Sequence, residues 1–238
     1  MSVAILMPTK DEAARLVRTL EAVRACAISM GDVTVFVVDD GSAPPVMPAG
    51  LPTPTPSFRI VLARHPVNLG QGAALETARQ LAFDRGKFDV YVTMDSDGQH
   101  AAEDAVALVR AVEAGADVAF GNRFLGGSAV PPARRAVLHA ARLFERILTG
   151  LRLADAHNGL RAFSRRGVAA VAIRQNRMAH ATEITQRVAR ARSLDLTLVE
   201  VPVTVRYTRE TSAKGQRASG AALILRDLLG QYLFGEAE

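Results

Sequence analysis

The sequence has very little cysteine and few aromatic side chains. Among 238 residues, Cys26 is the only cysteine, tryptophan is absent and aromatic residues make up 5%. A single thiol cannot form an internal disulfide, and it excludes a zinc site built on several cysteines. Because aromatic rings for base stacking are scarce and no tight run of Lys or Arg occurs, the sequence argues against a nucleic-acid partner.

The sequence also lacks a long apolar run. Its most apolar stretch, residues 220–234, is interrupted by Arg226, Asp227 and Gln231, whereas a membrane-spanning helix needs about 20 apolar residues. The opening residues, MSVAILMPTKDE, turn acidic early and have no basic region before the apolar segment, unlike a signal peptide. We therefore expect a cytoplasmic protein, with peripheral contact at the inner face of the membrane as an open alternative.

The composition that remains is that of a folded protein with an uneven charge. Apolar residues make up 49% and charged residues 22%, as in globular domains. Residues 1–120 hold 10 basic and 15 acidic residues, whereas residues 121–238 hold 19 and 9. The basic part is compatible with solvated helix faces, and equally with an anionic lipid or a phosphorylated ligand.

The first part of the sequence alternates apolar runs with helical patterns. Strands are predicted at residues 2–7, 33–38, 58–63, 89–94 and 118–120, and helices at 11–30, 71–85 and 102–114. This alternation predicts an α/β fold with a mostly parallel central sheet and helices on both faces. Further along, helices are predicted at 131–149, 181–192 and 223–233, a strand at 196–206 and a polar loop at 207–217. A chain of this length can form one large core, so we expect a single domain over residues 1–238.

A polar cluster follows each of the first four predicted strands. The clusters are PTKDE from Pro8, DDGS from Asp39, NLGQG from Asn68 and DSDGQH from Asp95. Turns and helix caps would explain any one of them. Because ligands of open α/β sheets bind beyond the carboxyl ends of the strands, four such clusters together predict a binding site at this edge.

Asp95 and Asp97 are the most informative pair. Two carboxylates one residue apart after a buried strand repel each other unless a cation lies between them. Hard oxygen ligands favour Mg²⁺ or Mn²⁺. Since Mg²⁺ usually shares its coordination shell with phosphates, the pair indicates a nucleoside diphosphate; a capped turn is the alternative.

Other phosphate-binding α/β folds fit less well. A dinucleotide-binding fold has G-x-G-x-x-G directly after its first strand, where this chain has Met7-Pro8-Thr9-Lys10. A P-loop is absent from the sequence. Phosphatases that form an aspartyl-phosphate carry D-x-D on their first strand, whereas here it follows the fourth.

The ordered set P-x-x-x-E, V-D-D-G-S, N-x-G-x-G-x-A and D-S-D-G-Q-H resembles family 2 glycosyltransferases of the GT-A fold. The similar branch is that of dolichyl-phosphate mannose synthase and bacterial polysaccharide glycosyltransferases. Residues 155–163, DAHNGLRAF, resemble its D-x-x-x-G-x-R-x-F segment. The resemblance covers roughly residues 3–217, and Asp11 and Gln71 stand where the family often has Asn and Lys.

The resemblance implies a metal-dependent, inverting transfer of a sugar from a nucleoside-diphosphate sugar. It divides the chain into a nucleotide-binding half, 1–121, and an acceptor-binding half, 122–238. The implied metal ligands, for Mg²⁺ or Mn²⁺, are Asp95, Asp97 and Gln99. The implied nucleotide-binding residues are Pro8, Lys10, Glu12, Asp39, Asp40, Asn68, Gly70, Gly72, Asp95 and Ser96.

Three functions stay open, because the sequence does not identify the acceptor. Transfer to a glycan hydroxyl, in cell-surface polysaccharide or lipopolysaccharide assembly, needs a general base, for which Glu183 is the candidate. Transfer to a polyprenyl phosphate needs no base, because the phosphate is already ionised. A nucleotide-sugar-binding module without turnover is the third possibility. Cations that would contact the phosphates or the acceptor are Arg134, Arg135, Arg161 and Lys214, the last in the 207–217 loop, which we expect to close over the donor.

Overall fold

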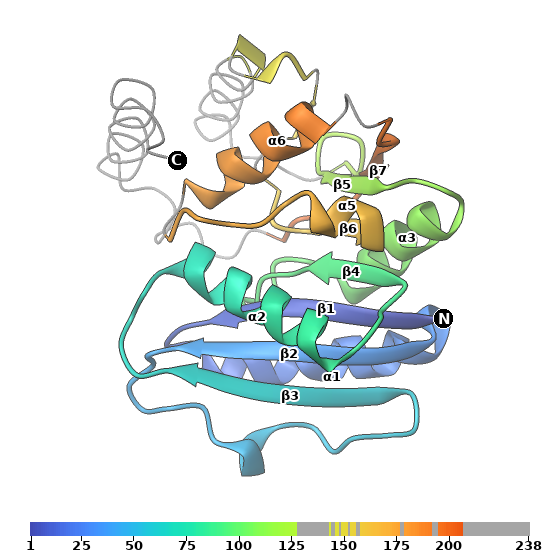
Figure 1. The fold of residues 1–238 in the computed structure, drawn as a ribbon. Helices are drawn as coiled ribbons and strands as arrows, with labels where there is room; N and C mark the ends of the chain where they lie inside the picture. Colours follow the sequence, from blue (N-terminus) through green and yellow to red (C-terminus); the bar gives the residue numbers. More distant parts are fainter. Residues whose placement is uncertain are drawn as a thin grey trace. The chain divides into compact units, whose positions relative to one another are not determined.

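A computed structural model describes residues 1–127, 143, 146–147, 149–151, 153–155, 158–176, 179–191 and 195–206 (Figure 1). The described residues belong to one compact unit that ends at Arg206. The predicted loop at 207–217, the predicted helix at 223–233 and most of the predicted helix at 131–149 lie outside the described residues. The single-domain prediction for 1–238 therefore stays a prediction.

Within the described residues, seven strands form one mixed sheet in the order β3-β2-β1-β4-β6-β5-β7. The strands are β1 (Ser2–Thr9), β2 (Asp32–Asp40), β3 (Phe58–His65), β4 (Val90–Thr93), β5 (Val118–Asn122), β6 (Arg161–Ser164) and β7 (Leu198–Pro202). Neighbouring strands are parallel except where β6 pairs with β4 and β5. The mostly parallel sheet is confirmed. β6 was not predicted, because its four residues, RAFS, include an arginine and are too few to show a strand pattern.

Helices cover both faces of the sheet, as predicted (Figure 1). The helices are α1 (Ala13–Met30), α2 (Gln71–Arg85), α3 (Ala102–Glu113), α5 (Arg165–Ala169) and α6 (His180–Ala191), with a short 3-10 turn, η1 (Pro48–Gly50). Alternate residues of a strand point to opposite faces, so Val3, Ile5 and Met7 pack with α1 and α3. Ala4 and Leu6 pack on the other side, with α2, α5 and α6.

The register of the central strands places the carboxyl ends of β1, β2 and β4 at the same edge of the sheet. Thr9 of β1 lies beside Asp39 of β2, and Leu6 of β1 lies beside Thr93 of β4. Because these strands are parallel, the turns that follow them gather at the same carboxyl edge. The polar clusters predicted from the sequence are in this way brought together.

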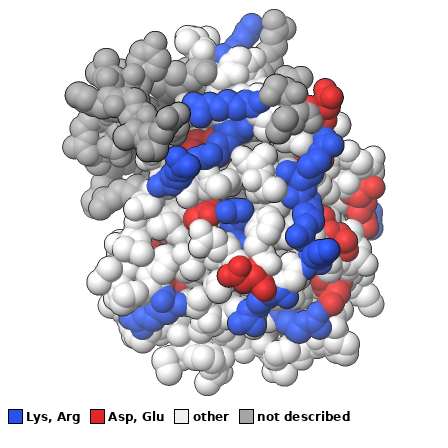
Figure 2. Space-filling model, in the orientation of Figure 1, with Lys and Arg blue, Asp and Glu red and all other residues white. Residues whose placement is uncertain are grey.

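Basic side chains predominate on part of the surface. Figure 2 shows Lys and Arg side chains gathered over α5 and α6, with few acidic groups among them. Exposed arginines of these two helices are Arg165 and Arg166 on α5 and Arg190 on α6, and Arg174 is exposed in the segment between the helices. Among the described residues, no helix is long and apolar enough to span a bilayer.

Candidate functional site

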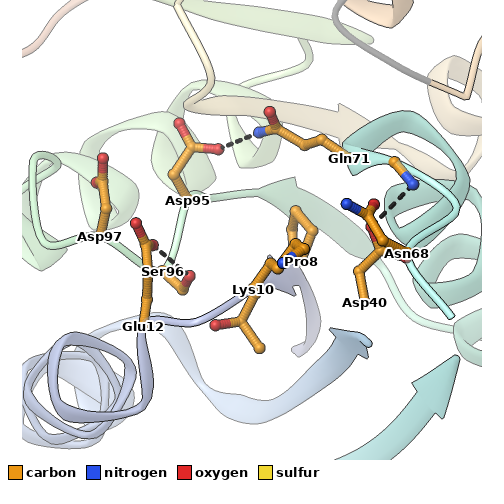
Figure 3. A pocket seen from close by; sticks show the side chains of 11 residues that line it. Pro8, Lys10, Glu12, Asp40, Asn68, Gln71, Asp95, Ser96 and Asp97 are labelled. Atoms are coloured by element: carbon orange, nitrogen blue, oxygen red, sulfur yellow. Dashed lines mark hydrogen bonds between the residues drawn. The ribbon is translucent and has the colours of Figure 1, made fainter. Parts of the chain in front are cut away.

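A pocket of about 450 Å³ opens at the carboxyl edge of β1, β2 and β4 (Figure 3). Its size is within the range of small-molecule sites, roughly 300–1,000 Å³. The residues that line it are Pro8, Thr9, Lys10, Glu12, Asp40, Asn68, Gly70, Gln71, Asp95, Ser96 and Asp97. All except Thr9 and Gln71 belong to the predicted nucleotide or metal site, so the structure brings most of that site together.

Asp39, at the end of β2, holds a loop and does not line the pocket. It is fully buried, and it accepts hydrogen bonds from the backbone N–H groups of Ser42 at 2.9 Å and Val46 at 3.0 Å. Burial alone would raise the pKa of Asp39, but the hydrogen bonds from Ser42 and Val46 outweigh it and hold the pKa below its usual range. Asp39 is thus a structural anchor, whereas the resemblance implied that it binds the nucleotide.

Asp40 lines the pocket, but its carboxylate also fixes the next loop. It accepts from the backbone N–H groups of Leu69 at 2.9 Å and Gly70 at 2.8 Å, and it lies 2.8 Å from Nδ1 of His65. Nε2 of His65 lies 3.0 Å from the hydroxyl of Thr77. A proton on Nδ1 satisfies both contacts of the ring, since Nε2 then accepts from the hydroxyl. Asp40 therefore places the loop that carries Asn68 and Gly70 to the pocket.

Asp95 and Asp97, after β4, have the opposite electrostatic character. Burial raises the pKa of Asp95, although the positive charges of His180 and Arg161 oppose the rise. Burial, followed by repulsion from Asp95, raises the pKa of Asp97. Here the surroundings disfavour two negative charges, whereas those of Asp39 favour one.

The donor set fits a hard divalent cation that shares its shell with a diphosphate. The carboxylates of Asp95 and Asp97 lie on the same side of the pocket (Figure 3). In the part of the chain that the structure describes, no three His, Cys, Asp or Glu residues form a group suited to a metal. Two carboxylates leave coordination positions for phosphate oxygens and water, as is usual for Mg²⁺, and a cation between them would relieve their repulsion. Gln99, the predicted third ligand, donates its backbone N–H to Asp97 at 2.9 Å but does not line the pocket.

Two contacts join the polar clusters around the pocket. The side-chain amide of Gln71, at the start of α2, donates to Asp95 at 2.9 Å. The hydroxyl of Ser96 donates to Glu12 at 3.3 Å. These contacts connect the turns after β1 and β4 and the N-terminus of α2 into one wall (Figure 3).

Gly159 packs directly against Asp95, a role that the sequence did not indicate. A Cβ at this position would lie 2.3 Å from Oδ2 of Asp95. The hydroxyl of Thr93 donates to the carbonyl of Gly159 at 2.7 Å. Only glycine allows this approach, which explains the glycine in the D-x-x-x-G-x-R-x-F segment.

Arg161 lies within the sheet, not on the pocket wall. Its side chain is 1% exposed and its guanidinium lies 5.5 Å from the centre of the Phe120 ring. This placement argues against the predicted direct contact with a phosphate, because the group is covered by protein. Its charge acts on Asp95 instead, where it opposes the rise in pKa.

Glu183, the predicted general base, does not line the pocket either. It is 7% exposed and accepts from the backbone N–H groups of Arg174 and Gln175, at 2.9 and 2.8 Å. It also pairs with Arg187, one turn along α6, at 2.7 Å. A carboxylate that already accepts from these groups is poorly placed to take a proton from an acceptor hydroxyl, so the geometry argues against the predicted role.

The remaining predicted residues are Gly72, Arg134, Arg135 and Lys214. Gly72 is buried on α2 and donates its N–H to the carbonyl of Asn176 at 2.9 Å, so it is not part of the pocket lining. Arg134, Arg135 and Lys214 lie outside the described residues. Their predicted contacts with the phosphates or the acceptor stay predictions.

Comparisons with known proteins agree with this arrangement. The family model "Glycosyl transferase family 2" matches residues 4–171. A polyprenol monophosphomannose synthase of Mycolicibacterium smegmatis is 35% identical over 68% of this chain. The matched region spans 61% of that relative's length. An undecaprenyl-phosphate mannosyltransferase of Micrococcus luteus is 33% identical over 86% of this chain and 83% of its own length.

The fold is also similar to solved structures. Glucosyl-3-phosphoglycerate synthase from Mycobacterium tuberculosis, in a crystal with Mn²⁺ and UDP-glucose, has a TM-score of 0.67 and 18% identity, covering 98% of this chain and 78% of that one. At this identity the likeness concerns the fold alone. Together, the family match, the relatives and the GT-A fold show that this chain belongs to glycosyl transferase family 2.

Proposed function

We propose that the protein transfers a sugar from a nucleoside-diphosphate sugar to a polyprenyl phosphate, with a divalent cation held by Asp95 and Asp97. The observation that carries the proposal is the pair of carboxylates with raised pKa in a pocket at the carboxyl edge of the sheet. When bound there, Mg²⁺ or Mn²⁺ would stabilise the charge of the departing diphosphate. Pro8, Glu12 and Asp40 would border the nucleoside.

The choice of a lipid phosphate as acceptor has two supports. The name of one relative refers to a polyprenol monophosphomannose, and the name of another refers to undecaprenyl phosphate. In addition, a phosphate oxygen can attack the anomeric carbon directly while the bond to the donor diphosphate breaks, so no base is needed. Such a reaction suits a site whose predicted base, Glu183, is occupied by hydrogen bonds from Arg174, Gln175 and Arg187.

A lipid acceptor would place the reaction at a membrane surface. The exposed arginines over α5 and α6 (Figure 2) would favour an anionic leaflet, where each basic residue near the surface contributes about 1 kcal/mol. We therefore propose peripheral membrane contact by this face. The division into a donor half and an acceptor half is part of the same proposal.

The test is a transfer assay with paired acceptors. The purified protein is incubated with Mn²⁺ and radiolabelled GDP-mannose, UDP-glucose or UDP-N-acetylglucosamine, together with undecaprenyl phosphate or with undecaprenol, which lacks the phosphate. We expect label in the phosphorylated lipid only. Transfer to oligosaccharide hydroxyls with none to the lipid phosphate would favour the polysaccharide alternative. Donor binding without transfer or hydrolysis would indicate a module without turnover.

A further inference from the structure

The segment 173–176 joins α2 to α6 through backbone hydrogen bonds. Glu76 of α2 accepts the N–H of Ile173 at 2.9 Å. From the other side, Glu183 of α6 accepts the N–H groups of Arg174 and Gln175 at 2.9 and 2.8 Å. One carboxylate from each helix thus holds this segment in place.

The same segment caps the N-terminus of α2. The carbonyl of Asn176 accepts from the N–H groups of Gly72 at 2.9 Å and Ala73 at 3.3 Å. These two groups would otherwise be without partners in the first turn of the helix, where a phosphate could use them. The approach is close: a Cβ on Gly72 would lie 1.8 Å from the carbonyl oxygen of Gln175.

The first residue of α2 reaches into the pocket. Gln71 lies next to Gly72 in the chain, lines the pocket and donates to Asp95 at 2.9 Å (Figure 3). The position of the first turn of α2 therefore sets the position of Gln71 against Asp95. A continuous line of contacts leads from Glu183 to the carboxylate proposed to hold the cation.

We propose that Glu183 is a positioning residue for the donor pocket: it holds segment 173–176 on the N-terminus of α2 and thereby fixes Gln71 against Asp95. The inference rests on the proposed function, since Asp95 is taken as a ligand of the metal–diphosphate. Glu183 is buried and accepts hydrogen bonds on both carboxylate oxygens. Replacing either oxygen by an amide NH₂ would set a donor against a donor.

The first test compares Glu183→Gln with Glu21→Gln. Glu21 is an exposed glutamate on α1 that pairs with Arg24 three residues away, so it matches the ion pair but holds no loop. With Mn²⁺ present, donor binding by calorimetry and steady-state kinetics should show roughly 2- to 30-fold weaker donor affinity in Glu183→Gln, the range for coupling through packed elements. The kcat should fall less than about 10-fold, and the pH–rate profile should keep its shape. Glu21→Gln should match the wild type.

A general base would behave in the opposite way. In that case kcat would fall by about 10²–10⁴ with unchanged donor affinity, and the pH–rate profile would lose its acid-side limb, which reports deprotonation of the base. That result, or unchanged values of both parameters, would overturn the positioning role.

Gly72→Ala breaks the same contact from the other side. The added Cβ must displace Gln175, whereas in the control Gly50→Ala it meets nothing within 4 Å. We expect Gly72→Ala to weaken donor binding, and the double variant with Glu183→Gln to be little worse than the weaker-binding single variant, because both disrupt one contact. Fully additive losses would contradict the inference.

Hydrogen exchange tests the coupling without any ligand. In Glu183→Gln, exchange should accelerate at the amides of Gly72 and Ala73 while the central strands stay protected. Uniform acceleration, or none, would overturn the inference. If no donor binds to the wild type, the proposed function fails, and the exchange result still decides the coupling.

Discussion

The two acidic turns at the carboxyl edge look alike in the sequence but differ in their surroundings. Asp39 and Asp40 are the last two residues of β2 and lead into Gly41-Ser42, and Asp95-Ser96-Asp97-Gly98 follows β4. In the first turn, hydrogen bonds to Asp39 outweigh the effect of burial and lower its pKa. In the second, burial raises the pKa of both Asp95 and Asp97.

The difference separates carboxylates that hold loops of the fold from the two carboxylates that we propose as cation ligands. Asp39 and Asp40 accept backbone N–H groups from loops that they shape. Asp95 and Asp97 share a site where a second negative charge is unfavourable, and perturbed groups of this kind gather at functional sites. Site and scaffold are thus distinguished by the donors around a carboxylate, which a short motif does not specify.

The largest expected effect is on metal-dependent binding. Asp97→Asn should weaken divalent-dependent binding of a nucleoside diphosphate by about 100-fold or more, because a bound cation contributes several kcal/mol of charge stabilisation. Calorimetry with UDP or GDP and Mn²⁺ measures the change. Asp89→Asn is the control, since Asp89 is paired with Ser2 at the other end of the sheet. Equal affinity in Asp97→Asn and the wild type would refute the metal site.

Asp39→Asn should instead reduce stability. The substitution leaves one buried N–H, of Ser42 or Val46, facing an amide NH₂, and an unsatisfied buried group costs about 1–3 kcal/mol. For a chain of this size, the melting temperature falls by roughly 2–4 °C per kcal/mol. Scanning calorimetry measures the loss. A variant as stable as the wild type but defective in metal-dependent binding would reverse the assignment of the two turns.

Lowering the pH should reduce the difference in stability between the wild type and Asp39→Asn. Because the pKa of Asp39 is below its ordinary value of 3.8, its ionised form contributes stability that is present above that value and lost as the pH falls through the folded-state pKa. The gap in unfolding free energy between the wild type and Asp39→Asn should therefore narrow below about pH 4. Urea titrations across that range would detect it; a gap that widens in acid would have the wrong sign.

The smallest effect is a gain in stability. Since the pKa of Asp97 is raised, the protonated form of Asp97 contributes folding stability. This stability is fully present below the ordinary pKa and is lost as the pH rises through the folded-state pKa. At pH 7, with EDTA present, Asp97→Asn should melt slightly above the wild type, because the amide carries no charge to repel Asp95. A lower melting temperature would show that the pair is not in conflict.

The sequence predicted the parallel part of the fold because its pattern is local. The helix predicted at 71–85 has the bounds of α2, and β1, β2 and β3 extend the predicted strands by only a few residues. β6 escaped prediction because it is short and its burial comes from β4 and β5 on either side. Its neighbours in space, not its sequence, make it a strand.

Pocket residues could be predicted where they lie close together in one turn of the sequence. They could not be predicted where tertiary packing brings them together. Asp95 and Asp97 were predicted from their place after a buried strand and Glu12 from the family resemblance, and all three line the pocket. Gly159 and Gln71 meet Asp95 from distant parts of the chain, and the burial of Arg161 and Glu183 follows from tertiary contacts. Residue type suggested a catalytic base at Glu183, whereas its hydrogen bonds indicate an anchor.

The most direct test of the account is a thermal-shift comparison of the wild type with Mn²⁺ alone, with UDP or GDP alone, and with both. If Asp95 and Asp97 hold a cation together with the diphosphate, a large shift should require both components. At a nucleotide concentration 100 times the dissociation constant, stabilisation is about 2.7 kcal/mol, or roughly 5–10 °C. An equal shift by the nucleotide in EDTA and in Mn²⁺ would contradict the claim that this turn is a metal–diphosphate site.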